Sequence, residues 1–234
     1  MRILGLETSG QDASVALYLD GEVHETWVRG SAGAPASDQL LATVTSLLEA
    51  HAVARASLDA IAFSSGPGAF TGVRVACSVA QGLAVALDRP VVPVGTLEAL
   101  AAEAGLGDIV CAQDARMGEL YLGCYRIESA QALPVQVGEL LCLPPSAVSA
   151  CGFARWRGAG SGFSVGGQGL VAALGGEAIV IDAQASPRAA AVARLGALRC
   201  AAGGAIDPAE VVPVYVRNKV AKTTAERLAE GLKA

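Results

Sequence analysis

The sequence predicts an α/β protein of two lobes. Short runs rich in Val, Ile and Leu alternate with longer helix-like runs, which is typical of an α/β fold. The chain is 53% hydrophobic but only 4% aromatic, which suits layers that pack closely through small side chains. Its 234 residues exceed the usual size of one domain. We therefore assign residues 1–105 to a first lobe and residues 106–234 to a second, whose final helix can pack back on the first.

The first half opens with three strands, at residues 2–8, 13–19 and 22–28. Asp20-Gly21 is a type I′ turn signal, so the second and third strands should form an antiparallel hairpin. A helix over about 37–51, capped by Ser37 or Asp38, is predicted next. It is indicated by an apolar face made of Leu40, Leu41, Val44, Leu47 and Leu48.

Two further strand and helix pairs complete the first half in the order βββαβαβα. They are a strand at 59–64, a helix at 71–87, a strand at 91–94 and a helix at 96–104. The helix at 71–87 is apolar around nearly its whole circumference, which indicates burial on more than one side. We expect one side to pack on the sheet and the other to form an interface with a partner, although a helix central in its own domain is the alternative. The predicted interface residues are Leu40, Val44, Leu47, Val75, Val79 and Leu83.

The second half reads as a less regular duplicate of the first. Strands are expected at 109–113, 119–127 and 135–142, a helix at 187–202 with Pro187 in its first turn, and another helix in the tail beyond Asp207. Each half opens with a strand that ends in an acid, Glu7 or Asp114, followed by a small turn and a second strand. Residues 152–169 are expected to be a loop around a short strand, with RNA contact by Trp156 as a minor alternative.

The segment Gly66–Arg74 links the strand at 59–64 to the apolar helix. A glycine loop that enters a helix can bind an anion through free backbone N–H groups and the helix dipole. It is not a P-loop, because no Gly-Lys-Ser/Thr follows at the required spacing. We name Gly66, Gly68, Thr71 and Arg74 as possible contacts to a nucleotide or a partner. The alternative is a tight turn in which glycine supplies positive φ and Thr71 caps the helix.

Charge and cysteine content limit the possible functions. A net charge of −5 argues against a broad nucleic-acid surface, so another subunit should hold most of any RNA. Six cysteines without a CxxC pair indicate reduced residues and a cytoplasmic location. We expect no apolar stretch to reach the roughly 18 to 20 residues that span a membrane.

Four motifs in this order resemble the TsaB (YeaZ) family. They are Ile3–Ser9, Gly66–Arg74, Asp114–Tyr121 and Pro213–Arg217. The resemblance runs over nearly the whole chain and is strongest in the first 125 residues.

The resemblance implies a two-lobed actin-like ATPase fold (ASKHA, ribonuclease H-like) and a role in forming N6-threonylcarbamoyladenosine at position 37 of tRNAs that read ANN codons. It implies a non-catalytic scaffold that activates the transferase TsaD, with the ATPase TsaE in the same complex. It also implies a homodimer when the chain is alone, no cofactor of its own, and ATP or ADP at the junction with TsaD. Contact with tRNA would be only indirect.

The residues themselves argue against catalysis. TsaD carries a metal-binding His-x-x-x-His pair where this chain has Thr96 and Leu100, and neither can replace imidazole. The only histidines, His24 and His51, are expected at the surface, and no His/Cys metal cluster can be assembled from the spacing.

Two enzymatic alternatives remain open at this point. The first is a stand-alone actin-like ATPase or kinase, in which Glu7, Asp12 and Asp114 would hold magnesium, although the same acids can simply form turns. The second is a glycoprotease-like metallopeptidase, which the scarcity of ligands makes the weakest interpretation.

Overall fold

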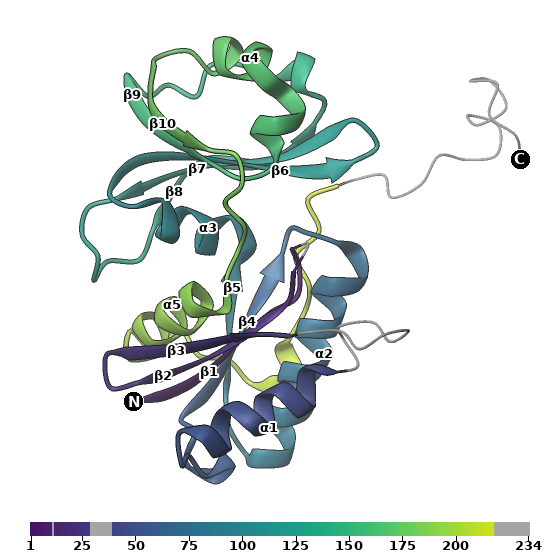
Figure 1. Ribbon diagram of the computed structural model, residues 1–234, viewed down its shortest axis with the longest axis vertical. Helices are drawn as coiled ribbons and strands as arrows, with labels where there is room; N and C mark the ends of the chain where they lie inside the picture. The colour runs from purple at the N-terminus through teal and green to yellow at the C-terminus, as the bar shows by residue number, and fades with distance from the viewer. Residues whose placement is uncertain (11, 29–38, 218–234) are drawn as a thin grey trace, which may run out of the picture.

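The computed structural model describes residues 1–10, 12–28 and 39–217, which form two α/β lobes (Figure 1). The first sheet contains β1 (Arg2–Glu7), β2 (Ser14–Leu19), β3 (Glu22–Trp27), β4 (Ala60–Gly66) and β5 (Val91–Gly95). The second contains β6 (Gly107–Arg116), β7 (Glu119–Ile127), β8 (Val135–Leu143), β9 (Arg155–Ala159) and β10 (Glu177–Asp182). The helices are α1 (Leu40–Ala50), α2 (Phe70–Leu87), α3 (Thr96–Ala104), α4 (Gly162–Leu174) and α5 (Ala189–Ala201). Short 3₁₀ turns are η2 (Arg55–Ser57), η3 (Pro145–Ala147) and η4 (Pro208–Glu210).

The two sheets share one topology, which confirms the predicted duplication. Their strand orders are β3-β2-β1-β4-β5 and β8-β7-β6-β9-β10. In each sheet the first three strands are antiparallel neighbours and the last two run parallel to the first. The order βββαβαβα of the first half is also confirmed. In the second half the 3₁₀ turn η3 stands where the first half has α1.

The hairpin of β2 and β3 turns at Asp20 and Gly21, as predicted. Their φ values are 47° and 110°, and a type I′ turn requires positive φ at both positions. The turn fixes the register in which Leu19 faces Glu22 and Ser14 faces Trp27.

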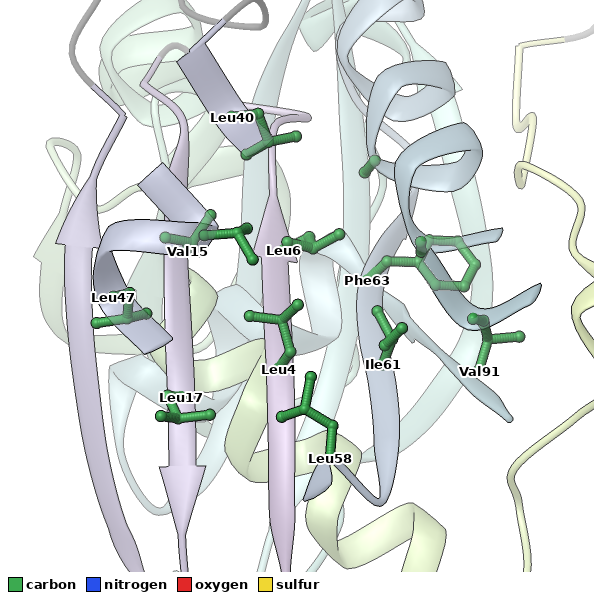
Figure 2. Close-up of a cluster of buried hydrophobic side chains, with 14 of the residues drawn as sticks. Leu4, Leu6, Val15, Leu17, Leu40, Leu47, Leu58, Ile61, Phe63 and Val91 are labelled. Atoms are coloured by element: carbon green, nitrogen blue, oxygen red, sulfur yellow. The ribbon is translucent and has the colours of Figure 1, made fainter. Parts of the chain in front are cut away.

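Helices α1 and α2 cover one face of the first sheet, and α5 covers the other (Figure 1). Alternate strand residues point to opposite faces, so Leu4 and Leu6 pack with α1 and α2 while Ile3 packs with α5. Figure 2 shows the first of these clusters, with Leu40 and Leu47 of α1 directed toward the strands.

The last α-helix of each half packs across the lobe boundary. Helix α3 follows the first sheet, but Leu97, Leu100 and Ala101 are buried against β6, β7 and β9 of the second. Helix α5 follows the second sheet, but it packs on β1, β2 and β4 of the first. This exchange ties the lobes together through their cores.

Three parts of the second half differ from the sequence analysis. Residues 162–174 form α4, kinked at Gly167, where a loop was expected, because packing of Phe163, Leu170 and Leu174 outweighs the low helix propensity of glycine. Strand β10 was missed altogether. Trp156 is completely buried and donates its indole N–H to the Gly175 carbonyl (2.8 Å), so the alternative of RNA contact is wrong.

Helix ends also differ from the predictions. Helix α2 begins at Phe70 with Ala69 at the N-cap, so Thr71 is not the cap. Pro187 lies before α5, whose N-cap is Arg188. The predicted caps Ser37 and Asp38, and most of the expected tail helix, lie outside the described residues.

The 18 residues of α2 have a mean hydropathy of 1.5, so length and composition alone would let it cross a membrane. The expectation that no apolar stretch is long enough is therefore wrong by this measure. The inner side of α2 nevertheless packs on the sheet through Val73, Ala76 and Ala80, as in a core helix of a globular lobe.

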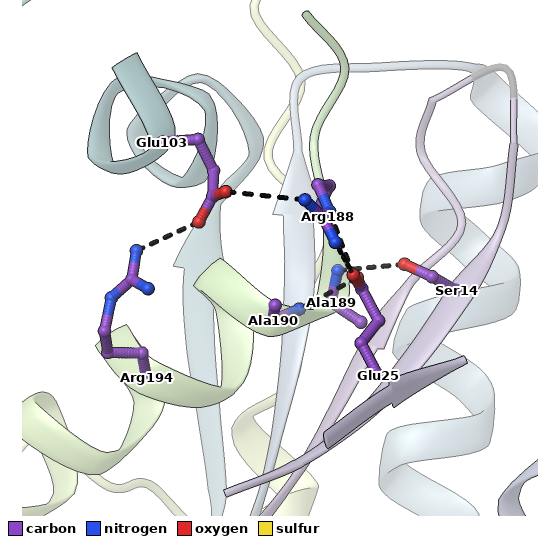
Figure 3. A network of polar contacts seen from close by, with 7 residues as sticks. All are labelled: Ser14, Glu25, Glu103, Arg188, Ala189, Ala190 and Arg194. Carbon is purple, nitrogen blue, oxygen red and sulfur yellow. Dashed lines mark hydrogen bonds and ion pairs between the residues drawn. The ribbon is translucent and has the colours of Figure 1, made fainter. Parts of the chain in front are cut away.

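A polar network fixes the start of α5 on the first sheet (Figure 3). Glu25 of β3 is 8% exposed, accepts the Ala190 N–H (3.1 Å) and pairs with the Arg188 guanidinium. The Ser14 hydroxyl accepts the Ala189 N–H (2.9 Å), so two otherwise free N–H groups of the first turn are satisfied. Glu103 of α3 bridges Arg188 and Arg194.

We expect Glu25→Ala to lower the free energy of unfolding by about 2 kcal/mol, because it leaves a partly buried N–H and an arginine without their carboxylate. Urea denaturation measures the change. Glu22→Ala on the same strand is the control, since Glu22 is 83% exposed and should change stability by less than about 0.5 kcal/mol. Equal effects of the two substitutions would contradict this role for Glu25.

Candidate functional site

The glycine loop packs tightly against the turn that follows β1. The Ala69 N–H donates to the Ser9 carbonyl (2.8 Å), and the Thr8 hydroxyl donates to the Gly72 carbonyl (2.6 Å). A Cβ at Gly72 would overlap the Thr8 carbonyl oxygen. The loop therefore serves close backbone packing, and its first N–H groups are partly used within the chain.

The predicted contact residues of this loop have different surroundings. Gly66 is buried at φ 106°, as the tight-turn alternative predicted, and a Cβ there would lie 2.7 Å from the Val214 carbonyl oxygen. Gly66 is thus covered by its own chain and is not available to a ligand. Gly68 lines a cleft between the lobes, whereas Thr71 is exposed outside it.

Arg74 lies on the first turn of α2 between two aromatic rings. Its guanidinium carbon is 3.2 Å from the centre of the Phe70 ring and 5.2 Å from that of Tyr215. Both rings are about half exposed, at 52% and 51%. Cation–π contact holds the charge in place, and Arg74 Nη1 has no hydrogen bond within the described part of the chain.

Three of the six predicted interface residues are wrong. Leu40, Val44 and Leu47 are at most 6% exposed and pack on the strands of their own lobe (Figure 2). They occupy the i, i+4 and i+7 positions of α1, which form the face toward the sheet. Leu41 lies off that stripe and is 52% exposed, a distinction that helical periodicity could have supplied.

The three predicted residues of α2 lie at the edge between core and solvent. Val75, Val79 and Leu83 are partly buried against the first-lobe core. Beside them, Ser78, Gly82 and Ala86 are exposed and repeat every four residues, so they share one side of the helix. We call these six residues of α2 the outer face. A Cβ at Gly82 meets no atom within 4 Å.

A cleft of about 580 Å³ separates the lobes. It is lined by the turn after β1, the glycine loop, the end of β6 and the chain between β10 and α5. Its polar side chains include Asp12, Asp114 and Ser161. Residues 214–217 line it as well. The sequence analysis identified them as part of a family motif but did not assign them to a site.

Glu7, the last residue of β1, and Asp114, two residues before the end of β6, form turns. Glu7 is fully buried, and its Oε1 accepts the Ser9 N–H (2.5 Å), the Ser9 hydroxyl (2.6 Å) and the Gly10 N–H (3.2 Å). At the matching position, Asp114 Oδ1 accepts the Arg116 N–H (2.7 Å). Each acid thus binds the N–H two residues later. This supports the turn-forming interpretation over that of magnesium ligands.

The positions of the missing histidine pair are buried in α3. Leu100 is fully buried, and Thr96 Oγ1 lies 2.9 Å from Ser9 Oγ. The rings of His24 and His51 lie against each other at 30°, with their centres 3.9 Å apart. Within residues 1–10, 12–28 and 39–217, no group of three His, Cys, Asp or Glu side chains could hold a metal ion. All six cysteines are free.

Burial raises the pKa of the Glu7 carboxyl above its ordinary value of 4.5, and hydrogen bonds from Ser9 and Gly10 only partly oppose the rise. At pH values between the pKa of Glu7 in the unfolded chain and its higher pKa in the folded chain, the folded chain binds more protons than the unfolded chain. The stability that Glu7 contributes is thus fully present below pH 4.5 and is lost as pH rises through the folded pKa.

We therefore expect Glu7→Gln, which keeps Oε1 as an acceptor but cannot ionise, to lose less stability with rising pH than the original chain. Urea denaturation at a series of pH values above 4.5 tests this. Glu210→Gln, at an exposed position, should follow the original profile. Parallel profiles for Glu7→Gln and the original chain would show that Glu7 ionises freely in the fold.

Comparison with known proteins places the chain in a family. The family described as "TsaD: tRNA N6-adenosine threonylcarbamoyltransferase" matches residues 32–145. The tRNA threonylcarbamoyladenosine biosynthesis protein TsaB of Haemophilus influenzae is 30% identical, over 94% of this chain and 95% of that protein. A tRNA N6-adenosine threonylcarbamoyltransferase of Chlorobaculum tepidum is 36% identical, over 42% of this chain and 32% of that protein.

A solved structure agrees with the sequence relatives. YeaZ from Pseudomonas aeruginosa is 36% identical, with a TM-score of 0.81 over 92% of this chain and 99% of that one. Together with the two sheets of equal topology, this confirms the two-lobed actin-like, ribonuclease H-like fold. The chain belongs to the TsaB (YeaZ) family of tRNA threonylcarbamoyladenosine biosynthesis proteins.

Proposed function

We propose that this chain is a non-catalytic scaffold subunit that binds and activates TsaD in the formation of N6-threonylcarbamoyladenosine at position 37 of tRNAs reading ANN codons. The observation that carries the proposal is the outer face of α2, whose apolar and small side chains remain accessible although the core beneath them is complete. Family membership supplies the pathway, and the outer face supplies a surface for the partner.

The shape of the outer face suits a second helix. Ser78, Gly82 and Ala86 form a shallow row beside the ridge of Val75, Val79 and Leu83. Ridges of one helix pack into such grooves of another, at interaxial distances of about 8–10 Å. The residues that match the TsaD family, 32–145, include α1 and α2, so we propose a bundle of these helices with their counterparts in TsaD.

When the chain is alone, the same face forms a homodimer, because the α1 and α2 helices of a second copy can cover it. TsaE joins the complex, ATP or ADP lies at the junction with TsaD, and tRNA is held mainly by the other subunits. Arg74, with its exposed aromatic neighbours, is the polar contact at the start of this face. The complex works in the cytoplasm.

The absence of catalysis from this chain is part of the proposal. Glu7 is engaged in its own turn, and Leu100 fills a hydrophobic core where TsaD is expected to hold a metal ligand. These contacts support the proposal that the chain uses the fold to bind a partner and does not catalyse the transfer reaction.

Gly82→Glu tests the surface. Gly82 is exposed, nothing lies near its Cβ position, and glutamate is the better helix former, so the isolated chain should stay folded. Burying the charge against TsaD should weaken binding by about a hundredfold. Isothermal titration with purified TsaD measures the effect, and circular dichroism checks the fold.

Gly169→Glu is the matched control, because Gly169 is also an exposed helical glycine with nothing near its Cβ position, but lies on α4 of the second lobe. It should bind TsaD normally. Unchanged binding by a folded Gly82→Glu chain would remove the outer face from the interface.

Reconstitution of the tRNA modification with and without this chain tests the scaffold role. Product should form with the complete set and fall by at least about tenfold without the chain, which on its own should not hydrolyse ATP with magnesium. Undiminished modification in its absence would overturn the scaffold. Hydrolysis of ATP by the chain alone, lost on Asp114→Ala, would favour the stand-alone ATPase.

A further inference from the structure

The segment that follows α5 first becomes part of the first lobe. Ile206 pairs with Val91 at the edge of β5, and Gln81 of α2 donates its side-chain N–H to the Pro208 carbonyl (2.7 Å). Val211 is 8% exposed and belongs to the first-lobe core. The Val214 N–H then donates to the Ser65 carbonyl (2.7 Å) at the end of β4.

The same segment next crosses the cleft. Val214, Tyr215, Val216 and Arg217 all line it, and the Tyr215 ring lies 6.3 Å from that of Phe70 at the start of α2. Figure 1 shows this yellow segment passing α2 and ending beside the turn between β6 and β7. We call residues 211–217 the strap.

Arg217 attaches the strap to the second lobe. Its Nη2 donates to the carbonyls of Ala115 (2.9 Å) and Arg116 (3.3 Å) and lies 2.7 Å from Glu119 Oε2. The side chain is only 16% exposed, so these contacts are shielded from water.

The turn between β6 and β7 is shaped to receive this guanidinium. Arg116, Met117 and Gly118 have φ values of 63°, 56° and 77°, and this left-handed run keeps the Ala115 and Arg116 carbonyls outside the normal ladder. A charged donor shared by two carbonyls and a carboxylate is among the stronger protein contacts.

The other connections between the lobes lie elsewhere. They run through α3 and α5, where Arg199 Nη2 lies 2.6 Å from Glu98 Oε1 and Arg194 Nη2 lies 3.0 Å from Glu103 Oε1. If the lobes were joined only through α3 and α5, these helices would act as a hinge about which the lobes can rotate. A second attachment across the cleft removes this freedom.

We propose that the strap is a latch that fixes the angle between the lobes and narrows the cleft, with Arg217 as its fastening residue. When Arg217 is released, the second lobe rotates about the α3 and α5 side and the cleft opens. The latch also joins the turn after β6 to the start of α2, through Tyr215 and Phe70, so the position of the second lobe is coupled to that end of the outer face.

Hydrogen exchange of the full chain, followed by mass spectrometry, tests the latch. In Arg217→Ala we expect residues 115–119 and 213–217 to exchange about tenfold faster, because charge-assisted contacts that hold them are lost. The β4 strand should keep its original rate. Small-angle X-ray scattering should show a larger radius of gyration for the variant.

Two further variants keep the test decisive. Arg126→Ala removes an ion pair with Asp108 within the second lobe and should leave exchange at the strap and the scattering unchanged. If Arg217→Ala does not fold, Glu119→Gln removes only the charged acceptor and should shift both measurements in the same direction by less. Unchanged exchange and scattering in the folded Arg217 variant, or faster exchange spread equally into β4, would overturn the latch.

Discussion

Helix α2 carries apolar side chains around most of its circumference, whereas a sheet can cover only one side of a helix. Val73, Ala76 and Ala80 are buried on the first sheet, and Gly72 lets the helix approach the turn after β1 without a steric clash. The outer face is left with small and aliphatic side chains. Its burial requires a second molecule, and the proposed scaffold function follows from this excess of apolar surface.

The duplicated architecture fits the proposal that this chain is a scaffold rather than a catalyst. Glu7 of β1 and Asp114 of β6 are held by their own turns, and α3 is buried through Leu97 and Leu100. The buried side chains of α3 hold the lobes together. The exchange of α3 and α5 between the sheets makes each lobe depend on the other, and the strap adds an attachment on the opposite side of the cleft.

Local patterns were sufficient to predict much of the first lobe. The Asp20-Gly21 turn and the apolar periodicity of α1 are short-range signals, and the structure confirms both. They do not say what covers an apolar face, so Leu40 and Leu47 were assigned to a partner although their own sheet buries them. Helix α4 was missed because its glycines weaken the local signal. The contacts of Arg217 join residues about a hundred positions apart, beyond the reach of any local pattern.

The central claim is that the outer face of α2 binds a partner. Hydrogen exchange of this chain, free and bound to purified TsaD, tests it most directly. The account predicts that binding slows exchange in peptides from α1 and α2 while peptides from α4 are unchanged. Protection confined to the second lobe, with α1 and α2 exchanging at their free rates, would contradict it.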